Sequence, residues 1–291
     1  MTTINHNSEG SAKAGRGSVV PLTHAQLGQA LGLSQAVSWP YRAEDWQFAL
    51  ELGHGYGVET EGQLVGTALW WPYGDTFASA GMIIVSETAQ RQGIGGRLMD
   101  AMLRDAAGRR MILNSTVEGR ALYTRLGFQP YGMVTQHQAV LGKPPAIDTG
   151  VPVRAATPED FGAIRVIDKA ASGMERNRLI DALAAIADTV VVEREGRVTG
   201  YGMVRRWGRG YVIGPVIARD ATDAKAIVAV LASAYEGHFV RIDVTQACGL
   251  GPWLEEIGLP QVGQVVSMSL GAPPESEDGA VLFGLSNQSL G

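Results

Sequence analysis

The chain has 291 residues and a mass of 30.9 kDa, a length that predicts two domains at roughly 100 to 200 residues each. Hydrophobic residues make up 45% of it and charged residues 18%, which excludes a disordered or fibrous protein. With 24 Lys and Arg against 29 Asp and Glu, the net charge of −5 lacks the basic excess of a general nucleic-acid binder.

The cysteine and histidine counts bear on disulfides and metals. A single cysteine, Cys248, excludes a disulfide framework, and the five histidines show no ligand spacing, so we expect no metal. No apolar run approaches the roughly 20 residues of a membrane-spanning helix, and the N-terminus lacks a signal-peptide core. We therefore expect a cytoplasmic protein without membrane or nucleic-acid partners, while a homodimer stays open.

The first half of the chain shows helices and antiparallel strands in a definite order. Residues 1–17 are polar and small, which predicts a mobile tail. The two-residue loop Glu61-Gly62 is typical of a tight hairpin. Around it the pattern predicts a strand at 18–22, helices opening at Thr23 and near Ala43, and strands at 56–60, 63–71 and 77–85.

The rest of this unit contains one crossover. A glycine-bearing loop precedes a helix whose apolar positions recur every three or four residues: Leu98, Met99, Met102, Leu103 and Ala106. A strand at 111–113, a short helix around Leu122 and two last strands, near Phe128 and at 134–141, complete the unit. Antiparallel strands followed by a single strand-helix-strand crossover predict an α+β fold.

The same order of elements restarts after a Pro- and Gly-containing linker at 142–150. Residues 58–66 and 192–200 share a Val, two Glu and two Gly at an offset of 134 positions. Three matches in the same order predict a duplicated fold, with domains at 18–141 and 151–291. The other two matches pair 81–85 with 214–218 and Leu126-Gly127-Phe128 with Ile257-Gly258-Leu259.

Residues that can bind an anion gather in one loop. It opens a helix and consists of Gln90, Arg91, Gln92, Gly93, Ile94, Gly95, Gly96 and Arg97. Backbone N–H groups at a helix start are unsatisfied and carry the positive end of the helix dipole, so they can bind a phosphate. The three glycines let a pyrophosphate approach these groups, and Arg91 and Arg97 add positive charge.

Two common nucleotide-binding motifs do not fit this loop. The dinucleotide fingerprint needs a parallel strand before the loop and an acidic residue about 20 positions later, whereas this chain has antiparallel strands and Asn114. A Walker loop would need Gly-Lys-Ser/Thr, which does not follow.

These residues together carry a family resemblance. Gln90-x-x-Gly93-x-Gly95 after a strand ending in Val85, with Leu122-Tyr123-x-x-Leu126-Gly127-Phe128 about 30 residues on, resembles the GNAT superfamily of acyl-CoA-dependent N-acetyltransferases. The resemblance covers about residues 18–141. The duplicated layout also resembles bacterial proteins that pair a GNAT domain with a C-terminal GNAT-like domain. It implies two tandem α+β domains, each a mixed, mostly antiparallel sheet flanked by helices.

The resemblance implies a site for acetyl-CoA. The loop at 90–97 would hold the pyrophosphate, and the main chain of Ile83, Ile84 and Val85 would pair with the pantetheine arm as an added strand. The next strand, ending at Asn114, would splay away and make room for the thioester. Tyr123 matches the family's tyrosine that protonates the leaving CoA thiolate, and Thr116 stands where the family often has an asparagine that contacts the cofactor.

The acceptor side is less defined. A lysine-like amine, with a pKa of about 10.4, must lose a proton before it attacks. His54, Glu59 and Asp75 lie in suitable elements, but the sequence does not identify a base, and deprotonation relayed by water is equally open. Candidates for the wall of an acceptor pocket are Trp39, Tyr41, Trp70, Trp71 and Tyr73.

The second copy departs from the first in its chemistry. Residues 223–228 stand in place of 90–95 without a glycine, and Leu254 stands in place of Tyr123. We therefore expect this copy neither to bind CoA nor to catalyse, but to cover the cleft, with Arg205, Arg241 and Asp243 as charged candidates. One CoA should bind per chain, and an isolated 18–145 segment should retain all the affinity.

The sequence thus predicts an enzyme that transfers acetyl from acetyl-CoA to a small-molecule primary amine by direct attack, with Tyr123 as general acid. Two alternatives stay open: a non-catalytic CoA-binding sensor or scaffold, and an acetyltransferase that acts on protein N-termini or lysines. The amine and the acyl-chain length are not defined by the residues.

Overall fold

The computed structural model describes residues 17–142, 150–277 and 279–291, so the predicted tail and linker lie almost wholly outside the described residues. Within them, the strands form one continuous sheet in the order β1-β2-β3-β4-β5-β12-β6-β11-β13-β10-β9-β8-β7. Neighbouring strands are antiparallel except in the β4–β5 and β10–β11 pairs, which are parallel. The predicted α+β class is confirmed.

The first half follows the predicted order closely. The hairpin turn is formed by Glu61 and Gly62, whose φ angles of 52° and 77° are those a two-residue turn requires. The elements are β1 (Ser18–Pro21), α1 (Leu27–Ala36), α2 (Ala43–Leu52), β2 (His54–Thr60), β3 (Gln63–Tyr73), β4 (Phe77–Val85), α3 (Ile94–Asp105), β5 (Arg110–Ser115), α4 (Arg120–Arg125) and β6 (Gln129–Val140).

The second half repeats this order, as predicted. Its hairpin turn, at Glu195 and Gly196, has φ angles of 53° and 71°, nearly those of the first. The elements are β7 (Val153–Ala155), α5 (Phe161–Ser172), α6 (Asn177–Ala184), β8 (Asp188–Arg194), β9 (Arg197–Trp207), β10 (Gly210–Ala218), α7 (Ala221–Ser233), β11 (Phe239–Thr245), α8 (Gly251–Glu256) and β12 (Gln261–Leu270). One further strand, β13 (Val281–Gly284), has no counterpart in the first half.

One prediction for the first half was wrong. The two strands expected near Phe128 and at 134–141 form a single strand, β6. Its register with β12 shifts between Gly132 and Pro130, which face Ser267 and Met268. The extra residue of such a bulge interrupts the alternation of side chains, and the sequence pattern therefore suggested two strands.

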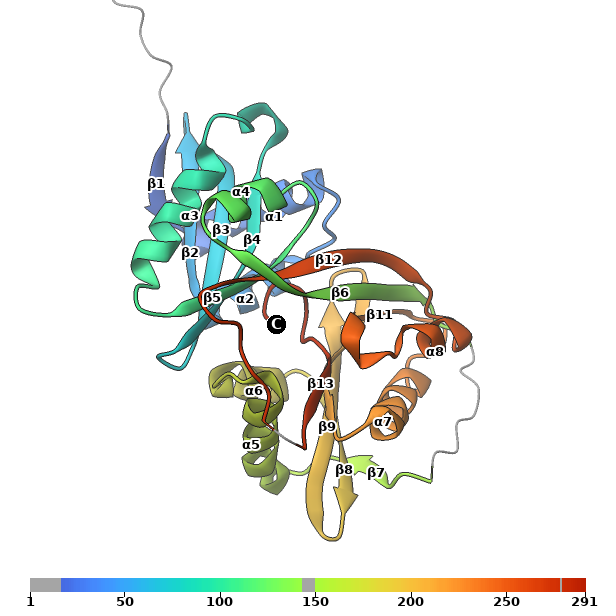
Figure 1. The fold of residues 1–291 in the computed structure, drawn as a ribbon. Coiled ribbons are helices and arrows are strands. Elements are labelled where there is room, and N and C mark those ends of the chain that lie inside the picture. The colour runs from blue at the N-terminus through green and yellow to red at the C-terminus, as the bar shows by residue number, and fades with distance from the viewer. Residues whose placement is uncertain (1–16, 143–149, 278) are drawn as a thin grey trace, which may run out of the picture.

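The two halves exchange their last strands. β12 comes from the second half and pairs with β5, whereas β6 comes from the first half and pairs with β11. β6 and β12 also pair with each other, and in Figure 1 they run side by side between the two halves. Met268 of β12 accordingly packs in the same core cluster as Leu113 and Phe128 of the first half.

The helices divide between the two faces of the sheet. α3 covers one face of the first half, where Leu98, Met99 and Met102 are buried against the strands. A separate large cluster on the other face contains residues of α1 and α2 together with Leu179 and Ile180 of α6. The halves therefore share a core on one face as well as strands.

The strand exchange removes the basis for expecting a self-sufficient first half. A segment 18–145 lacks β12, so one edge of β5 loses its partner and the core beneath α3 loses Met268. We expect the isolated segment to show no cooperative thermal unfolding, and co-expression with 146–291 to restore it. Circular dichroism melting would measure this, and a full-length melting temperature in the isolated segment would contradict it.

Candidate active site

β4 and β5 part halfway along β4. Their ladder runs from Phe77 with Arg110 to Ala80 with Leu113, and no rung follows it among the described residues. β5 continues instead beside β12, where Asn114 faces Ser267. The backbone of residues 81–85 is therefore without a strand partner on that side. Such an edge is suited to pair with an extended, amide-bearing ligand.

A β-bulge marks the point where the strands part. In the β3–β4 pair, Thr67 faces Ile84 but Leu69 faces Gly81, so two residues of β4 oppose one of β3. Met82 in the bulge has a φ of 50°, a strained value for a residue other than glycine. The Thr67 hydroxyl donates to the Met82 carbonyl over 2.9 Å and holds this conformation. Bulges of this kind re-aim a strand next to a site.

The loop after β4 leaves open space in front of α3. Gly93 caps the helix with a φ of 78°, and a Cβ added at Gly93 or Gly96 would meet nothing within 4 Å. A Cβ at Gly95 would instead lie 3.1 Å from Leu122. The unpaired N–H groups of the first turn and the helix dipole make this space suitable for an anion.

Tyr123 is held on α4 beside the parted strands. Its side chain is 7% exposed, and its ring meets that of Phe128 edge to face at 6.0 Å. Burial raises the pKa of Tyr123 to about 12, so the hydroxyl stays protonated at neutral pH. A buried phenol in this state can donate a proton.

A cavity of about 890 Å³ joins these features. Most of the predicted site residues line it: Ile83, Ile84, Val85, Gln90, Arg91, Gly93, Ile94, Gly95, Gly96, Asn114, Thr116 and Tyr123. Their roles toward a cofactor stay predictions.

Three predicted residues make contacts that the sequence did not indicate. Gln92 and Arg97 are not among the lining residues: Gln92 donates to the Thr88 carbonyl over 3.1 Å, and Arg97 donates to the Gly17 carbonyl. Asn114 lines the cavity, but its amide is engaged within the protein. It donates to the Gln288 carbonyl over 2.8 Å and accepts from the Ser267 hydroxyl over 2.7 Å.

The aromatic residues predicted for the acceptor side divide between the cavity lining and the core. Trp39 and Tyr41 line the cavity and, with Trp207, form an aromatic wall in which Tyr41 meets the other two rings edge to face. Trp70, Trp71 and Tyr73 are buried in the core instead. His54 stacks on Trp70, Glu59 accepts from Gln26, and Asp75 faces Arg109, so none of these three candidate bases lies in the cavity lining.

Sequence reasoning missed most of the cavity lining outside β4, the loop before α3 and α4. We call this part of the cavity, which includes Tyr41 and Arg241, the acceptor end. The missing residues come from the loop before α2, from β6, from the β9–β10 hairpin, from β11 and from the end of the chain. They are Val37, Ser38, Pro40, Gln136, Gln138, Trp207, Gly208, Arg209, Val212, Phe239, Asn287, Gln288 and Ser289. Of the predicted second-half candidates, Arg241 lines the cavity, whereas Arg205 and Asp243 lie behind it.

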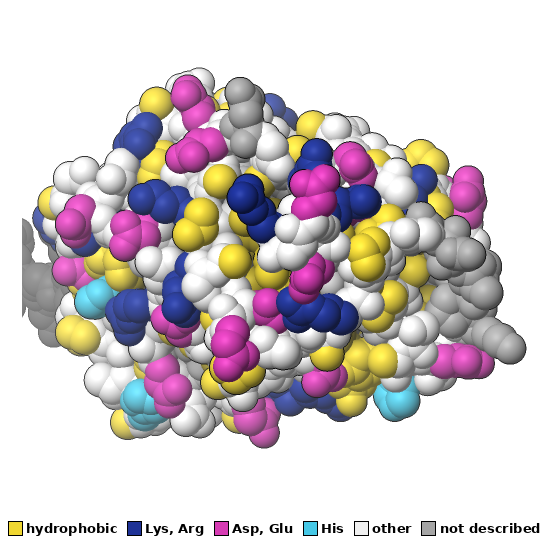
Figure 2. Space-filling view, turned by 90° about the horizontal axis from the view of Figure 1, so that it is seen from below, with side chains coloured by type: hydrophobic (Ala, Val, Ile, Leu, Met, Phe, Trp, Pro, Cys, Tyr) yellow, Lys and Arg dark blue, Asp and Glu magenta, His cyan; other side chains and the backbone are white. Residues whose placement is uncertain are grey.

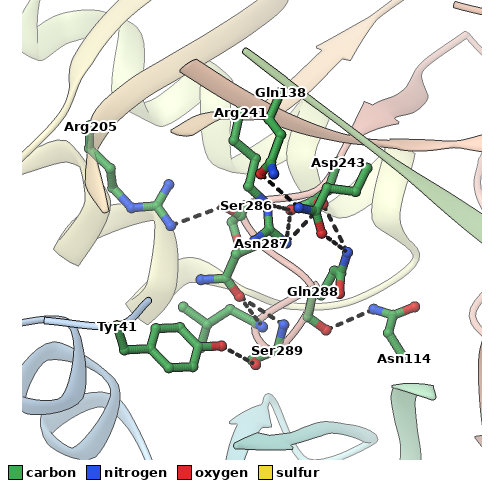
Figure 3. A network of polar contacts seen from close by, with 12 residues as sticks. Tyr41, Asn114, Gln138, Arg205, Arg241, Asp243, Ser286, Asn287, Gln288 and Ser289 are labelled. Atoms are coloured by element: carbon green, nitrogen blue, oxygen red, sulfur yellow. Dashed lines mark hydrogen bonds and ion pairs between the residues drawn. The ribbon is translucent and has the colours of Figure 1, made fainter. Parts of the chain in front are cut away.

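Residues 286–291, the C-terminal turn, are fixed between the two halves (Figure 3). Ser79 and Asn114 of the first half donate to the carbonyls of Ser289 and Gln288, over 2.7 and 2.8 Å. From the second half, Arg205 donates to the Ser286 carbonyl over 3.0 Å. A Cβ at Gly81 would lie 2.6 Å from Ser289, so the turn lies directly against the parted end of β4. Sequence periodicity gives no signal for such an irregular segment.

In the second half, the slot between the parallel strands is filled by the chain itself. β10 and β11 pair only as far as Ile213 with Ile242, and β13 then lies between them. β13 pairs with Val216, Ile217 and Ala218 of β10. Thr67 and Tyr201 follow the glycine of their hairpin turn by the same number of residues, and they face Ile84 and Ile217, so Ile217 corresponds to Ile84. β13 therefore pairs with the edge that corresponds to residues 83–85, which have no strand partner on that side in the first half.

The anion-binding features of the first half are also replaced in the second. The loop corresponding to 86–93 is reduced to residues 219–220, so Asp223 lies in the first turn of α7 rather than in a loop. Asp220 caps this helix by accepting from the Asp223 backbone N–H over 2.9 Å, and the buried Asp223 carboxylate pairs with Arg194. Leu254 holds the position of Tyr123 in α8, as the sequence predicts.

Among the described residues, none of the helices combines the length and the apolar composition needed to cross a membrane. In the same residues, no three His, Cys, Asp or Glu side chains gather in a way that could hold a metal ion.

The chain is similar to known acetyltransferase domains and proteins. Two family models match the chain, each described as an acetyltransferase (GNAT) domain, over residues 51–130 and 164–284. The uncharacterized N-acetyltransferase YitH of Bacillus subtilis (strain 168) is 25% identical over 231 residues, which cover 78% of this chain and 81% of that protein.

Solved structures resemble the whole chain. A putative acetyltransferase from Pyrococcus horikoshii matches with a TM-score of 0.80 and 19% identity, over 99% of both chains. A tandem GNAT protein from the clavulanic acid biosynthesis pathway matches with a TM-score of 0.63 and 15% identity, over 90% of this chain and 99% of its own. At these identities the matches show the fold alone.

The open space at α3 can be tested with one substitution. Gly96→Val adds a branched side chain to the cavity lining at a position where a Cβ meets nothing within 4 Å, so it should obstruct a pyrophosphate and weaken acetyl-CoA binding by more than about tenfold, or about 1.4 kcal/mol. Gly28→Val on α1 is the matched control, since a Cβ there also meets nothing within 4 Å and lies outside the lining. Equal affinities of the two variants by calorimetry would remove the loop from the site.

The filled slot of the second half predicts how many acetyl-CoA molecules bind to one chain. Because β13 occupies the strand edge of β10 and Asp223 the first turn of α7, we expect one acetyl-CoA to bind per chain. Isothermal titration of the full chain would measure this number. Two equivalent sites would mean that β13 leaves its place.

Proposed function

We propose that this chain, which belongs to the GNAT superfamily and is an acyl-CoA-dependent acetyltransferase, transfers acetyl to a small primary amine in the cavity of its first half. One observation carries the proposal. A single cavity contains the open start of α3, the unpaired edge of β4 and the Tyr123 side chain. These fit the pyrophosphate, the pantetheine amides and the thioester sulfur of acetyl-CoA.

The chemistry follows from these positions. Acetyl-CoA supplies an electrophilic thioester carbonyl, at which the neutral amine forms an N–C bond while the C–S bond breaks and the CoA thiolate leaves. Tyr123 gives its hydroxyl proton to that thiolate and is reprotonated from water, and the new amide loses its extra proton to water. Direct attack needs no nucleophile from the protein, which agrees with a lining that contains neither cysteine nor histidine among the described residues.

The acceptor end supports a small amine rather than a protein substrate. Its walls come from both halves: Tyr41 from the first, Trp207 and Phe239 from the second, and Ser289 from the C-terminal turn. Tyr41 also donates to or accepts from Ser289 over 3.3 Å, which ties the wall together. An acceptor enclosed on several sides is held in place for attack, which lowers the entropic part of the barrier.

Release of free thiol from acetyl-CoA on addition of primary amines tests the proposal directly. A protein that binds acetyl-CoA but releases no thiol with any amine is a sensor or scaffold. Turnover confined to peptides with free N-termini or lysines would instead assign a protein substrate.

Tyr123→Phe tests the general acid. A thiol with a pKa of about 8.5 is already a fair leaving group, so we expect kcat to fall by about 100-fold or less. The ring is retained, so acetyl-CoA affinity and melting temperature should stay near those of the wild type. Unchanged kcat with lowered stability would show that Tyr123 only packs the core.

The pH profile provides a second readout for Tyr123. Because the folded-state pKa is raised to about 12, the hydroxyl keeps its proton throughout the range from pH 7 to 10. Activity should therefore rise toward alkaline pH as the amine loses its proton, and fall through loss of the general acid only near pH 12.

A further inference from the structure

The acceptor end of the cavity is locally cationic. Arg209 and Arg241 line it, and the only acid among the described lining residues, Glu118, lies beside Thr116 just before α4. The outer surface differs: Figure 2 shows basic and acidic side chains intermingled over the face seen from below. The chain as a whole has a net charge of −5, so the positive lining is a local feature.

Two of the three guanidinium nitrogens of Arg241 bond a single carboxylate. Its Nε and Nη2 each donate to the Asp243 carboxylate over 3.0 Å, and Asp243 is fully buried. The Arg241 side chain is 21% exposed, and within the described residues its Nη1 makes no hydrogen bond. The carboxylate therefore fixes the guanidinium plane, and Nη1 remains a charged donor.

A chain of amides starts at the same carboxylate (Figure 3). Gln288 Nε2 donates to Asp243 over 3.0 Å and to Gln136 Oε1 over 3.2 Å. Gln136 Nε2 in turn donates to Gln138 Oε1 over 2.8 Å. Each amide is thereby oriented by the one before it, so Gln138 accepts with its oxygen and keeps its Nε2 as a donor.

The two residues that carry the remaining donors are neighbours in the sheet. Gln138 on β6 and Arg241 on β11 are direct cross-strand partners, and both line the cavity. Side chains at such positions are close enough to contact one group between them. A guanidinium nitrogen and an amide NH₂ side by side match the two oxygens of a carboxylate.

This donor pair lies near the reacting end of the cavity. Ser289 abuts Gly81 at the parted end of β4, and Tyr41 bonds Ser289 over 3.3 Å. Gln288 precedes Ser289 in this turn, and its Nε2 donates over 3.0 Å to Asp243, the carboxylate that holds Arg241. Arg241 is therefore linked, through Asp243 and Gln288, to the turn that lies against β4.

From this arrangement we infer that the acceptor is an amine that also carries a carboxylate, as an amino acid does. Arg241 Nη1 and Gln138 Nε2 bind the carboxylate, and Arg209 adds positive charge. The inference rests on the proposed function and specifies its substrate class. A polyamine or an aminoglycoside would meet two arginines at this end where its own cations need carboxylates.

The wild-type enzyme is tested first. Free thiol release from acetyl-CoA is measured with the protein amino acids, with their carboxamides and with spermidine. We expect kcat/KM for the best amino acid to exceed that for its carboxamide by at least about tenfold, because the amide lacks the charge that Arg241 pairs with. Spermidine should be a poor acceptor.

Gln138→Glu then tests the donor pair. The variant keeps the shape and the oxygen that accepts from Gln136, but replaces the free NH₂ donor by negative charge beside Arg241. We expect KM for the amino acid to rise at least about tenfold and KM for its carboxamide to change little. Gln129→Glu, on an exposed position of the same strand outside the lining, has the same charge change and should behave as the wild type.

The outcomes separate the two proposals. An amino acid no better than its carboxamide, preference for spermidine, or equal effects of Gln138→Glu on both acceptors would overturn the carboxylate assignment while the acetyltransferase stands. Acetyl-CoA binding without turnover of any amine would overturn the proposed function and the acceptor class with it.

Discussion

The structure depends on how unpaired backbone N–H and C=O groups find partners where two parallel strands part. Unpaired N–H and C=O groups inside a protein need partners, and each half of this chain meets that need differently. In the first half, the edge of β4 beyond Ala80 faces a cavity that a ligand can enter. In the second half, the corresponding edge of β10 is paired with β13. The same fold thus yields one open slot and one closed slot.

The closed slot contributes to the site in the open one. β13 leads directly into the C-terminal turn, which reaches across to β4 and β5 and presents Gln288 and Ser289 to the cavity. Arg205 links β10 to the C-terminal turn, because it donates to the Gly214 carbonyl over 2.9 Å and to the Ser286 carbonyl over 3.0 Å. With β6 placed beside β11 by the strand exchange, the acceptor end is built from both halves, and neither half contains it alone.

Much of the fold, and the grouping of residues 83–96 with Tyr123 around one cavity, was predictable because the signals are local. The Glu61-Gly62 turn, the glycines at the start of α3 and the Tyr123 motif each act within a few residues of their own position. The partners of β6 and β12 were not predictable, since alternation of side chains defines a strand but not its neighbour. Trp70 and Trp71 show the same limit, because an aromatic residue suits a core and a pocket equally well.

In the second half, segments of the chain itself occupy the positions that correspond to open space in the first half. β13 takes the place of an extended ligand on β10, the Asp223 carboxylate takes the place of an anion at the start of α7, and Leu254 stands where the first half has Tyr123. Since these partners are permanently attached, they are ordered without the entropic cost that a free ligand would pay on binding. Asp243 and Gln136 hold Arg241 and Gln138 in the same way, so the protein alone sets the positions of these two side chains, while residues 81–85 of β4 keep an edge without a strand partner. The aromatic wall and the Arg241–Gln138 pair are accordingly preformed, and the edge of β4 is the part of the cavity that the chain itself leaves unpaired.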